Sequence, residues 1–149
     1  MKLPAFQFTC LNCDGTFIEP EVPEGSYGIF LLRSDSGERR SLDAGVDPVF
    51  DEIVPLVRAI TGNQSNDRSF AALHHKAFSA TCDPDKLQQR FILGAKPTCP
   101  KCDSTELSWK PFEDVPPTEV PEVEHQLWSQ LSSDQKYGVI KNILTQTGT

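Results

Sequence analysis

The chain has 149 residues and a formal net charge of −7, and 38% of its residues are hydrophobic. This length and composition suit one domain with a modest core. No apolar run approaches the roughly 18 to 20 residues of a membrane-spanning helix, and residues 1–6 are not followed by the apolar region of a secretory signal. We therefore expect a cytoplasmic protein, whose paired cysteines stay reduced and favour metal binding over disulfides.

The N-terminal residues predict a short hairpin. Residues 2–9 alternate apolar and polar side chains, which is typical of a strand, and residues 15–18 form the expected return strand. An acidic, proline-containing loop follows at 20–25. A second hairpin is expected to pair residues 26–33 with residues 38–42.

The middle of the chain predicts helices. Asp47 can cap a helix that has Pro48 at its first position and apolar residues at helical spacing up to Ile60. Pro55 cannot donate a backbone hydrogen bond, so we expect a kink or a break there.

Two more helices and a strand are expected before the C-terminal region. The second helix begins at Ser65 or Asn66 and extends to Phe78, and a third, short helix lies between Pro84 and Gly94. Residues 106–112 predict a strand.

The C-terminal region predicts a linker and a helix. Three prolines make residues 116–127 an expected extended linker. Ser132 and Gln135 form a capping box for a final helix, which we place within residues 128–147.

Four cysteines in two CxxC pairs are the most informative feature of the sequence. The pairs are Cys10/Cys13 and Cys99/Cys102. Each pair can form a tight turn that directs two sulfurs at one ion, so together they predict a Cys₄ zinc site. A thioredoxin-type redox pair, two disulfides and four unrelated thiols are the alternatives. Because four cysteine ligands fill the coordination sphere, the zinc would be structural.

The second pair carries a resemblance. Residues 99–104 resemble the C-P-x-C-G-S turn of the zinc-ribbon or rubredoxin-like knuckle superfamily, with Asp103 in place of glycine. The resemblance implies one ion held between two hairpins and implies no activity. The residue after each pair, Asp14 or Asp103, is expected to adopt a left-handed conformation, which aspartate tolerates.

The distance between the pairs predicts a split site. Compact zinc ribbons separate their pairs by roughly 15 to 20 residues, whereas residues 14–98 intervene here. Closing a loop of about 90 residues costs roughly 4 kcal/mol, and structural zinc supplies about 10 to 16 kcal/mol. The ion therefore outweighs the closure cost.

We therefore predict one α+β domain over residues 1–149 that contains a split zinc ribbon. Its expected parts are zinc-knuckle hairpins at 1–25 and 95–115, an inserted hairpin and helices at 26–94, a linker at 116–127 and a C-terminal helix at 128–147.

Other residues that could support chemistry have simpler interpretations. Cys82 lies near His74 and His75 in sequence and could be a thiol nucleophile, but we prefer a half-buried thiol before a helix and surface or packing histidines. His125 is expected to be solvated. Asp83 and Asp85 flank a proline, where acidic residues stabilise a helix start.

The charge pattern favours a basic protein partner. Nucleic-acid binding needs a basic surface, but the only basic cluster is Arg33, Arg39 and Arg40. Acidic residues follow both cysteine pairs, and zinc would bring the two runs together. The expected partner-binding residues are acidic and follow the second pair: Glu113, Asp114, Glu119, Glu122 and Glu124.

Three functions follow, in this order of preference. The first is a protein without enzymatic activity that binds a basic partner, for example as an inhibitor in the manner of a toxin's immunity protein. The second is a zinc-ribbon adaptor or regulator of nucleic-acid machinery that acts through the arginines. The third is an enzyme that uses Cys82.

Overall fold

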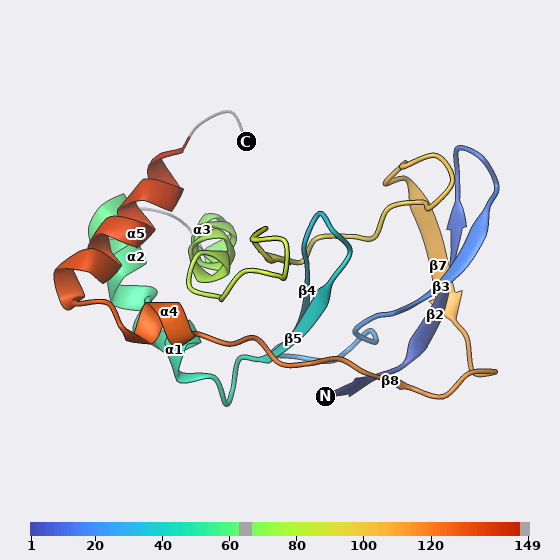
Figure 1. Ribbon diagram of the computed structural model, residues 1–149, viewed down its shortest axis with the longest axis horizontal. Helices are drawn as coiled ribbons and strands as arrows, with labels where there is room; N and C mark the ends of the chain where they lie inside the picture. The colour runs from blue at the N-terminus through green and yellow to red at the C-terminus, as the bar shows by residue number, and fades with distance from the viewer. Residues whose placement is uncertain (63–66, 147–149) are drawn as a thin grey trace.

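The computed structural model describes residues 1–62 and 67–146, which form an α+β fold (Figure 1). One end of the molecule is a β-sheet that carries the cysteine turns, and the other end is a group of helices. A second small sheet lies between them. The predicted fold class is therefore confirmed. No helix among the described residues is long and apolar enough to cross a membrane.

The knuckle sheet contains three antiparallel strands, β2 (Ala5–Cys10), β3 (Thr16–Pro20) and β7 (Leu107–Pro111), in the order β3-β2-β7. The first hairpin and the strand after the second cysteine pair are therefore confirmed. The central strand buries alternate side chains, including Phe6 and Phe8, because side chains two residues apart share one face of a strand.

The second sheet has the order β5-β4-β6 and is also antiparallel. Its strands are β4 (Ile29–Arg33), β5 (Arg39–Asp43) and β6 (Ile92–Leu93). The predicted hairpin is confirmed, but its first strand begins three residues later than expected. Gly28 adopts φ 78°, a left-handed conformation that interrupts an extended strand.

The break in the first predicted helix is confirmed. Helix α1 (Pro48–Glu52) ends at Ile53, and α2 (Val54–Thr61) starts directly after it. Asp47 caps α1 by accepting a 2.9 Å hydrogen bond from the Val49 amide. Pro55 has no amide proton and occupies the first turn of α2, where helices tolerate proline.

The remaining helices are α3 (Asp67–Ser79), α4 (Gln126–Ser129) and α5 (Ser133–Thr145). The expected start of α3 at Ser65 or Asn66 lies outside the described residues. The capping box between Ser132 and Gln135 is present. It starts α5 at Ser133, so the predicted helix over 128–147 is divided into a short α4 and a separate α5.

The predicted helix between residues 84 and 94 is wrong. The carboxylate of Asp85 accepts 2.8 Å hydrogen bonds from the amides of Leu87 and Gln89, and Gln88 adopts φ 63°. These bonds close a loop instead of a helical turn, because an aspartate side chain competes for backbone amides. Phe91, one of the apolar residues that suggested a helix, is buried in the main core from this loop.

The segment expected to be an extended linker is extended, and it is also hydrogen-bonded to the N-terminal residues and to β5 of the second sheet. Strand β8 (Thr118–Glu119) pairs with β1 (Lys2–Leu3), and Val120 is only 1% exposed. Ser41 on β5 then exchanges backbone hydrogen bonds with residues 121 and 123. We call residues 112–125 the strap, which runs along one side of the molecule from β7 to α4 (Figure 1).

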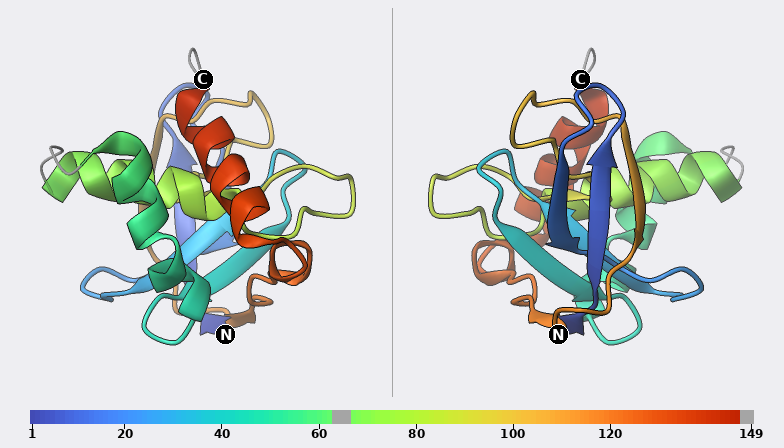
Figure 2. Two further views of the ribbon diagram at one scale, coloured as in Figure 1. Left: turned by 90° about the vertical axis from the view of Figure 1, so that its left-hand side faces the viewer. Right: turned by 90° about the vertical axis from the view of Figure 1, so that its right-hand side faces the viewer.

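Two hydrophobic cores differ greatly in size. The main core lies between the second sheet and the helices, and its buried members are Leu32, Leu42, Ile53, Val57, Ala77, Phe78, Cys82, Phe91, Trp128 and Ile140. The knuckle core contains Phe6, Phe8, Cys10, Cys99 and Leu107. Figure 2 shows the two ends of the molecule face-on, with the helices at one end and the knuckle sheet at the other.

Candidate metal centre

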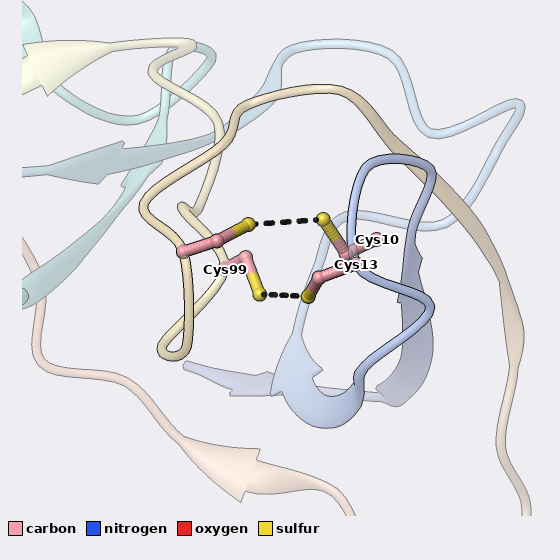
Figure 3. A group of neighbouring side chains, drawn as sticks. Cys10, Cys13 and Cys99 are labelled. Atoms are coloured by element: carbon pink, nitrogen blue, oxygen red, sulfur yellow. Dashed lines mark hydrogen bonds between the residues drawn. The ribbon is translucent and has the colours of Figure 1, made fainter.

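The four predicted cysteine ligands meet at one point (Figure 3). The Sγ atoms of Cys10, Cys13, Cys99 and Cys102 all lie within 4.8 Å of one another. The Cys10–Cys102 and Cys13–Cys99 sulfur pairs are each 3.5 Å apart. A tetrahedral ion with 2.3 Å metal–sulfur bonds requires sulfur separations of about 3.8 Å. The four side chains can therefore coordinate one metal ion with little movement.

The two cysteine turns have the same backbone geometry. In each turn the amide of the first cysteine donates to the carbonyl five residues later, and the amide four residues later donates back to the first cysteine. The bonds are Cys10 N to Gly15 O at 2.8 Å, Asp14 N to Cys10 O at 3.0 Å, Cys99 N to Ser104 O at 2.9 Å and Asp103 N to Cys99 O at 2.9 Å. The site is thus built from two copies of one local structure, 89 positions apart in sequence between Cys10 and Cys99.

The residue after each pair is left-handed, as the sequence predicts. Asp14 has φ 62° and Asp103 has φ 61°. A left-handed residue reverses the chain after the second cysteine, so that both sulfurs face the same point. Aspartate adopts this conformation at lower cost than most residues that have a Cβ atom, although glycine fits it better.

Amide groups surround the sulfurs. The backbone amides of Asn12 and Lys101 each lie 3.4 Å from the sulfur two residues earlier, and the Asn12 side-chain amide lies 3.5 Å from Cys102 Sγ. The Lys101 amide lowers the pKa of Cys99, and the Asn12 side chain lowers the pKa of Cys102. Such donors favour the thiolate form that binds metal.

The sulfurs cannot all ionise without a cation. The backbone amide of Gly15 lowers the pKa of Cys13, but the neighbouring Cys99 and Cys102 thiols raise it, and the resulting pKa is about 12. Adjacent thiolates repel each other, so a proton stays on one of them. A divalent cation at the centre removes this repulsion and allows all four to bind as thiolates.

Gly15 and Asn12 are site residues that the sequence analysis did not identify. A Cβ atom on Gly15 would lie 3.1 Å from Lys101 Cδ and 3.3 Å from Cys13 Sγ, so a larger residue would crowd the Cys13 sulfur and displace the Lys101 side chain. Asn12 joins the turns because its side chain reaches the sulfur of Cys102. Their positions inside or beside a CxxC pair are the only sequence signal for these roles.

Comparison with known proteins identifies no relative, because no protein-family model, curated protein or solved structure matches the chain. The metal centre is therefore supported by the geometry of its own residues.

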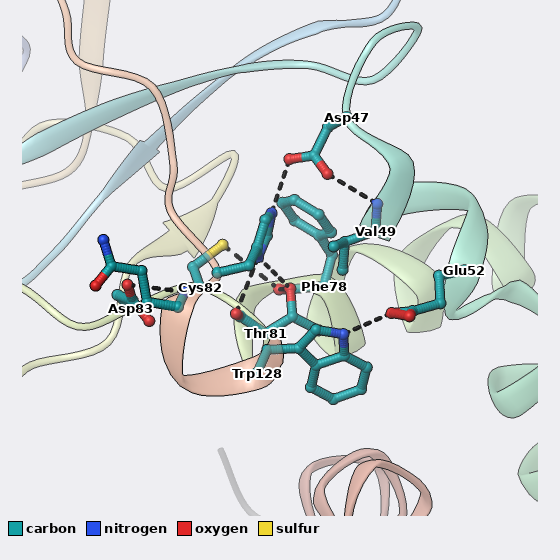
Figure 4. A network of polar contacts seen from close by, with 10 residues as sticks. Asp47, Val49, Glu52, Phe78, Thr81, Cys82, Asp83 and Trp128 are labelled. Carbon is teal, nitrogen blue, oxygen red and sulfur yellow. Dashed lines mark hydrogen bonds and ion pairs between the residues drawn. The ribbon is translucent and has the colours of Figure 1, made fainter. Parts of the chain in front are cut away.

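The structure does not pair the Cys82 thiol with His74 or His75. The Cys82 thiol is buried and donates to Phe78 O at 3.6 Å, and burial raises its pKa to about 12 (Figure 4). His74 donates instead to Phe50 O at 2.6 Å. Burial lowers the pKa of His74. A buried, protonated thiol is a poor nucleophile.

His125 is not solvated, which corrects the sequence prediction. Its Nε2 lies within hydrogen-bond distance of Asp47 Oδ2, at 2.7 Å, and its Nδ1 lies 2.9 Å from Thr81 O. Asp83, which was expected to cap the helix after it, instead accepts bonds from the amides of Gln126 and Leu127 at the start of α4. These contacts fasten the C-terminal end of the strap to the helices (Figure 4).

The basic cluster is neutralised inside the molecule. Each arginine of the β4–β5 hairpin pairs with a glutamate: Arg33 with Glu21 at 3.2 Å, Arg39 with Glu19 at 2.9 Å and Arg40 with Glu38 at 3.4 Å. Arg33 also donates to two backbone carbonyls and is buried. Glu19 and Glu21 therefore do not add to a free acidic surface, contrary to the prediction that both acidic runs combine.

The predicted acidic residues after the second pair lie along the strap. Glu113 and Asp114 are exposed next to the knuckle sheet, and Glu119 forms a 2.7 Å ion pair with the N-terminal ammonium group. Glu122 and Glu124 are exposed at the other end of the strap.

Glu122 and Glu124 border a cavity with a volume of about 670 Å³. Asp43 and Asp47 line the same cavity from the segment between β5 and α1. Its apolar lining includes Leu42, Val46, Pro48, Val49 and Val123, and no lysine or arginine lines it. We call this cavity the acidic groove.

Proposed function

We propose that this protein is a zinc-stabilised binding protein without enzymatic activity, and that the acidic groove takes a basic segment of a protein partner. The observation that carries the proposal is the groove itself, where two distant segments contribute carboxylates around an apolar surface. An inhibitor that covers a basic, nucleic-acid-acting enzyme is one form that this function would take.

Zinc is the proposed ion because of the ligand set. Four thiolates in tetrahedral arrangement are typical of structural zinc sites, and iron is the main competitor for such a site. Four protein ligands leave no position for a reactive water molecule, which supports a structural role.

The charges of the groove support a basic partner. Asp43 Oδ1 accepts one hydrogen bond from the Gly45 amide. The Asp47 carboxylate accepts a hydrogen bond from the Val49 amide and contacts the His125 ring. The carboxylate of Glu122 has no hydrogen-bond or ion-pair partner among the residues that the structure describes. Within the described part of the chain, the Glu124 carboxylate accepts only a 3.4 Å bond from the Gln126 side-chain amide. Exposed carboxylates beside apolar side chains suit lysine or arginine, whose long stems cover apolar surface while their charges reach the acids.

A direct binding titration tests the proposal. Fluorescently labelled peptides of equal length, one rich in lysine and leucine and one rich in glutamate and leucine, are titrated with the zinc-loaded protein at about 0.15 M salt. We expect only the basic peptide to bind, and we expect E122K/E124K to weaken its binding by more than tenfold.

The matched control is E113K/D114K, which makes the same change in net charge at the other end of the strap. We expect it to change the affinity by less than threefold. Equal losses in the two variants would show that net charge alone attracts the peptide, and the groove proposal would then fail.

The alternative function is an adaptor of nucleic-acid machinery that acts through Arg33, Arg39 and Arg40. Their ion pairs with glutamates leave little positive field, which weakens this proposal. Retention on duplex DNA or single-stranded RNA at about physiological salt, lost in Arg39→Glu, would favour the adaptor over the basic-partner function.

A further inference from the structure

A second cavity lies on the helical side of the molecule, away from the residues of the acidic groove. It has a volume of about 520 Å³ and is bordered by α3, α5 and the segment that leads into β6. Pockets of this size accommodate small organic ligands. We call it the α3–α5 pocket.

One part of the pocket is apolar. Ala72 contributes from α3, Ile92 and Leu93 from β6, and Ile143 from α5. Ile92 is 46% exposed although it is a large aliphatic residue. The exposed part of its side chain is therefore available to cover an apolar ligand group.

The charged groups of the pocket are all basic. Lys76 and Arg90 line it, and no carboxylate does so among the residues that the structure describes. Lys76 Nζ donates only a 3.4 Å bond to the Gln146 carbonyl. Arg90 has no hydrogen-bond or ion-pair partner within residues 1–62 and 67–146. The pocket lining is therefore positively charged, although the chain as a whole has a net charge of −7.

The other polar side chains of the pocket do not add charge. His75 is half-buried, and burial and the neighbouring His74 lower its pKa, so it is neutral near pH 7. Its ring lies edge-on to Phe30 with 5.1 Å between ring centroids. The hydroxyl of Ser79 donates a hydrogen bond to the His75 carbonyl and accepts one from the Leu93 amide. Its donor is therefore already used and is not free for a ligand.

We propose that the α3–α5 pocket binds a small amphipathic anion, with its acidic head group at Lys76 and Arg90 and its alkyl chain against Ile92, Leu93 and Ile143. The guanidinium of Arg90 can bind a carboxylate or a phosphate with two parallel hydrogen bonds. The apolar residues then remove the alkyl chain from water, which adds a hydrophobic contribution to binding. This site is independent of the acidic groove and of the proposed partner.

Calorimetric titration of the full-length, zinc-loaded protein tests the pocket. The probes are decanoate, decyl phosphate, decanol and decylammonium, each below the concentration at which it forms micelles. We expect at least one of the two anions to bind at least tenfold more tightly than decanol, and decylammonium not to bind. The ratio between the two anions identifies the preferred head group. Equal binding of decanol or of decylammonium would overturn the proposal.

Charge-reversal variants locate the site. We expect Arg90→Glu and Lys76→Glu each to weaken binding of the preferred anion by tenfold or more. The matched control is Lys141→Glu, an exposed residue of α5 that does not line the pocket, which should change the affinity by less than twofold. Methyl NMR signals of Ile92 and Ile143 should shift on titration, while that of Ile18 in the knuckle sheet stays in place. Shifts at Ile18 alone, or equal losses in all three variants, would overturn the proposed location.

Discussion

The knuckle sheet and the helical end of this protein are stabilised by different means. The helical end buries ten hydrophobic side chains in one cluster, whereas the knuckle core has five, of which two are cysteine ligands. A fully buried aliphatic or aromatic side chain contributes about 1.5 to 3 kcal/mol, and a structural zinc ion contributes about 10 to 16 kcal/mol. A zinc ion bound by the four cysteines would therefore stabilise the knuckle sheet more than its small core does, whereas hydrophobic burial dominates the helical end.

The two ends are connected by the path of the chain and by a small hydrophobic cluster. The chain enters the helical end after β5 and returns to the knuckle at Cys99, and the strap then runs back to α4. Val120 of the strap packs with Leu3 and Leu31 in a third small cluster between the two ends. Apart from this cluster, the Arg33–Glu21 and Arg39–Glu19 ion pairs join the two ends. Because each end has its own core, we expect either end to stay largely folded when the other is lost.

The largest expected effect comes from removing the metal. Chelation, or Cys99→Ser, should unfold the knuckle sheet, because four sulfurs can then no longer hold the two turns together. Hydrogen exchange should accelerate by more than a hundredfold at amides of β2 and β7 and by less than tenfold in α3 and α5.

Cys82→Ala is the control for this experiment, since it removes a thiol from the main core and not from the site. It should retain one metal ion per chain. Unfolding of both ends in a single transition on chelation would contradict the proposed independence.

A cavity in the main core should have the next largest effect. Phe78 is fully buried and its ring packs 5.4 Å from Phe50 and 5.3 Å from His125, measured between ring centroids. Phe78→Ala should lower the free energy of unfolding by about 3 to 5 kcal/mol in chemical denaturation. Metal content should not change.

Tyr27→Ala is the matched aromatic control, because Tyr27 is 94% exposed. It should change the free energy of unfolding by less than about 0.5 kcal/mol. A loss of metal in Phe78→Ala would show that the helical core also supports the knuckle.

A smaller, pH-dependent effect is expected at Asp85. Although burial raises its pKa, hydrogen bonds from Ser34, Ser36 and the Gln89 and Leu87 amides lower the pKa to about 2. The unfolded chain has the ordinary pKa of about 3.9. The carboxylate therefore stabilises the fold fully above about pH 5, and this contribution is lost as the pH falls from 4 to 2.

Asp85→Asn removes that pH-dependent contribution. The difference in stability between the native chain and Asp85→Asn should stay constant above about pH 5 and shrink as the pH falls from 4 to 2. Acid dissociation of the metal affects both proteins equally and cancels in the difference. A difference that stays constant down to pH 2 would contradict the assigned role.

The smallest effect is expected at the left-handed residue of the second turn. Asp103→Gly should leave stability unchanged or raise it by less than about 1 kcal/mol, because glycine adopts positive φ without strain. Asp103→Val should cost about 1 to 2 kcal/mol. The midpoint of metal release during titration with a chelator measures both variants, and equal midpoints would contradict the backbone argument.

Local sequence patterns were sufficient for much of the fold. The CxxC spacing and the residues after it predicted both turns, and the capping residues Asp47 and Ser132 predicted two helix starts. These features depend on hydrogen bonds within about five residues of the chain, so their signal is contained in short segments.

The sequence misjudged segments whose structure depends on distant contacts. Prolines in the strap predicted an extended linker, but they did not predict the backbone bonds to Ser41 and the pairing with β1 that hold it in place. Helical spacing predicted a helix near Phe91, but Asp85 and the serines of the β4–β5 turn hold that segment as a loop.

The amino-acid sequence by itself determined the four cysteines of the candidate metal site, the turns that present them and the positions of most strands and helices, because each follows from short-range geometry. Only the tertiary structure decided which charges remain free. Glu19 and Glu21 belong to the acidic run after the first cysteine pair, yet arginines of a different hairpin neutralise them, while Asp43 and Asp47 join Glu122 and Glu124 at the groove. The interaction energy of two charges depends on the distance between them in the fold. That distance is set by packing between segments that are far apart in the chain.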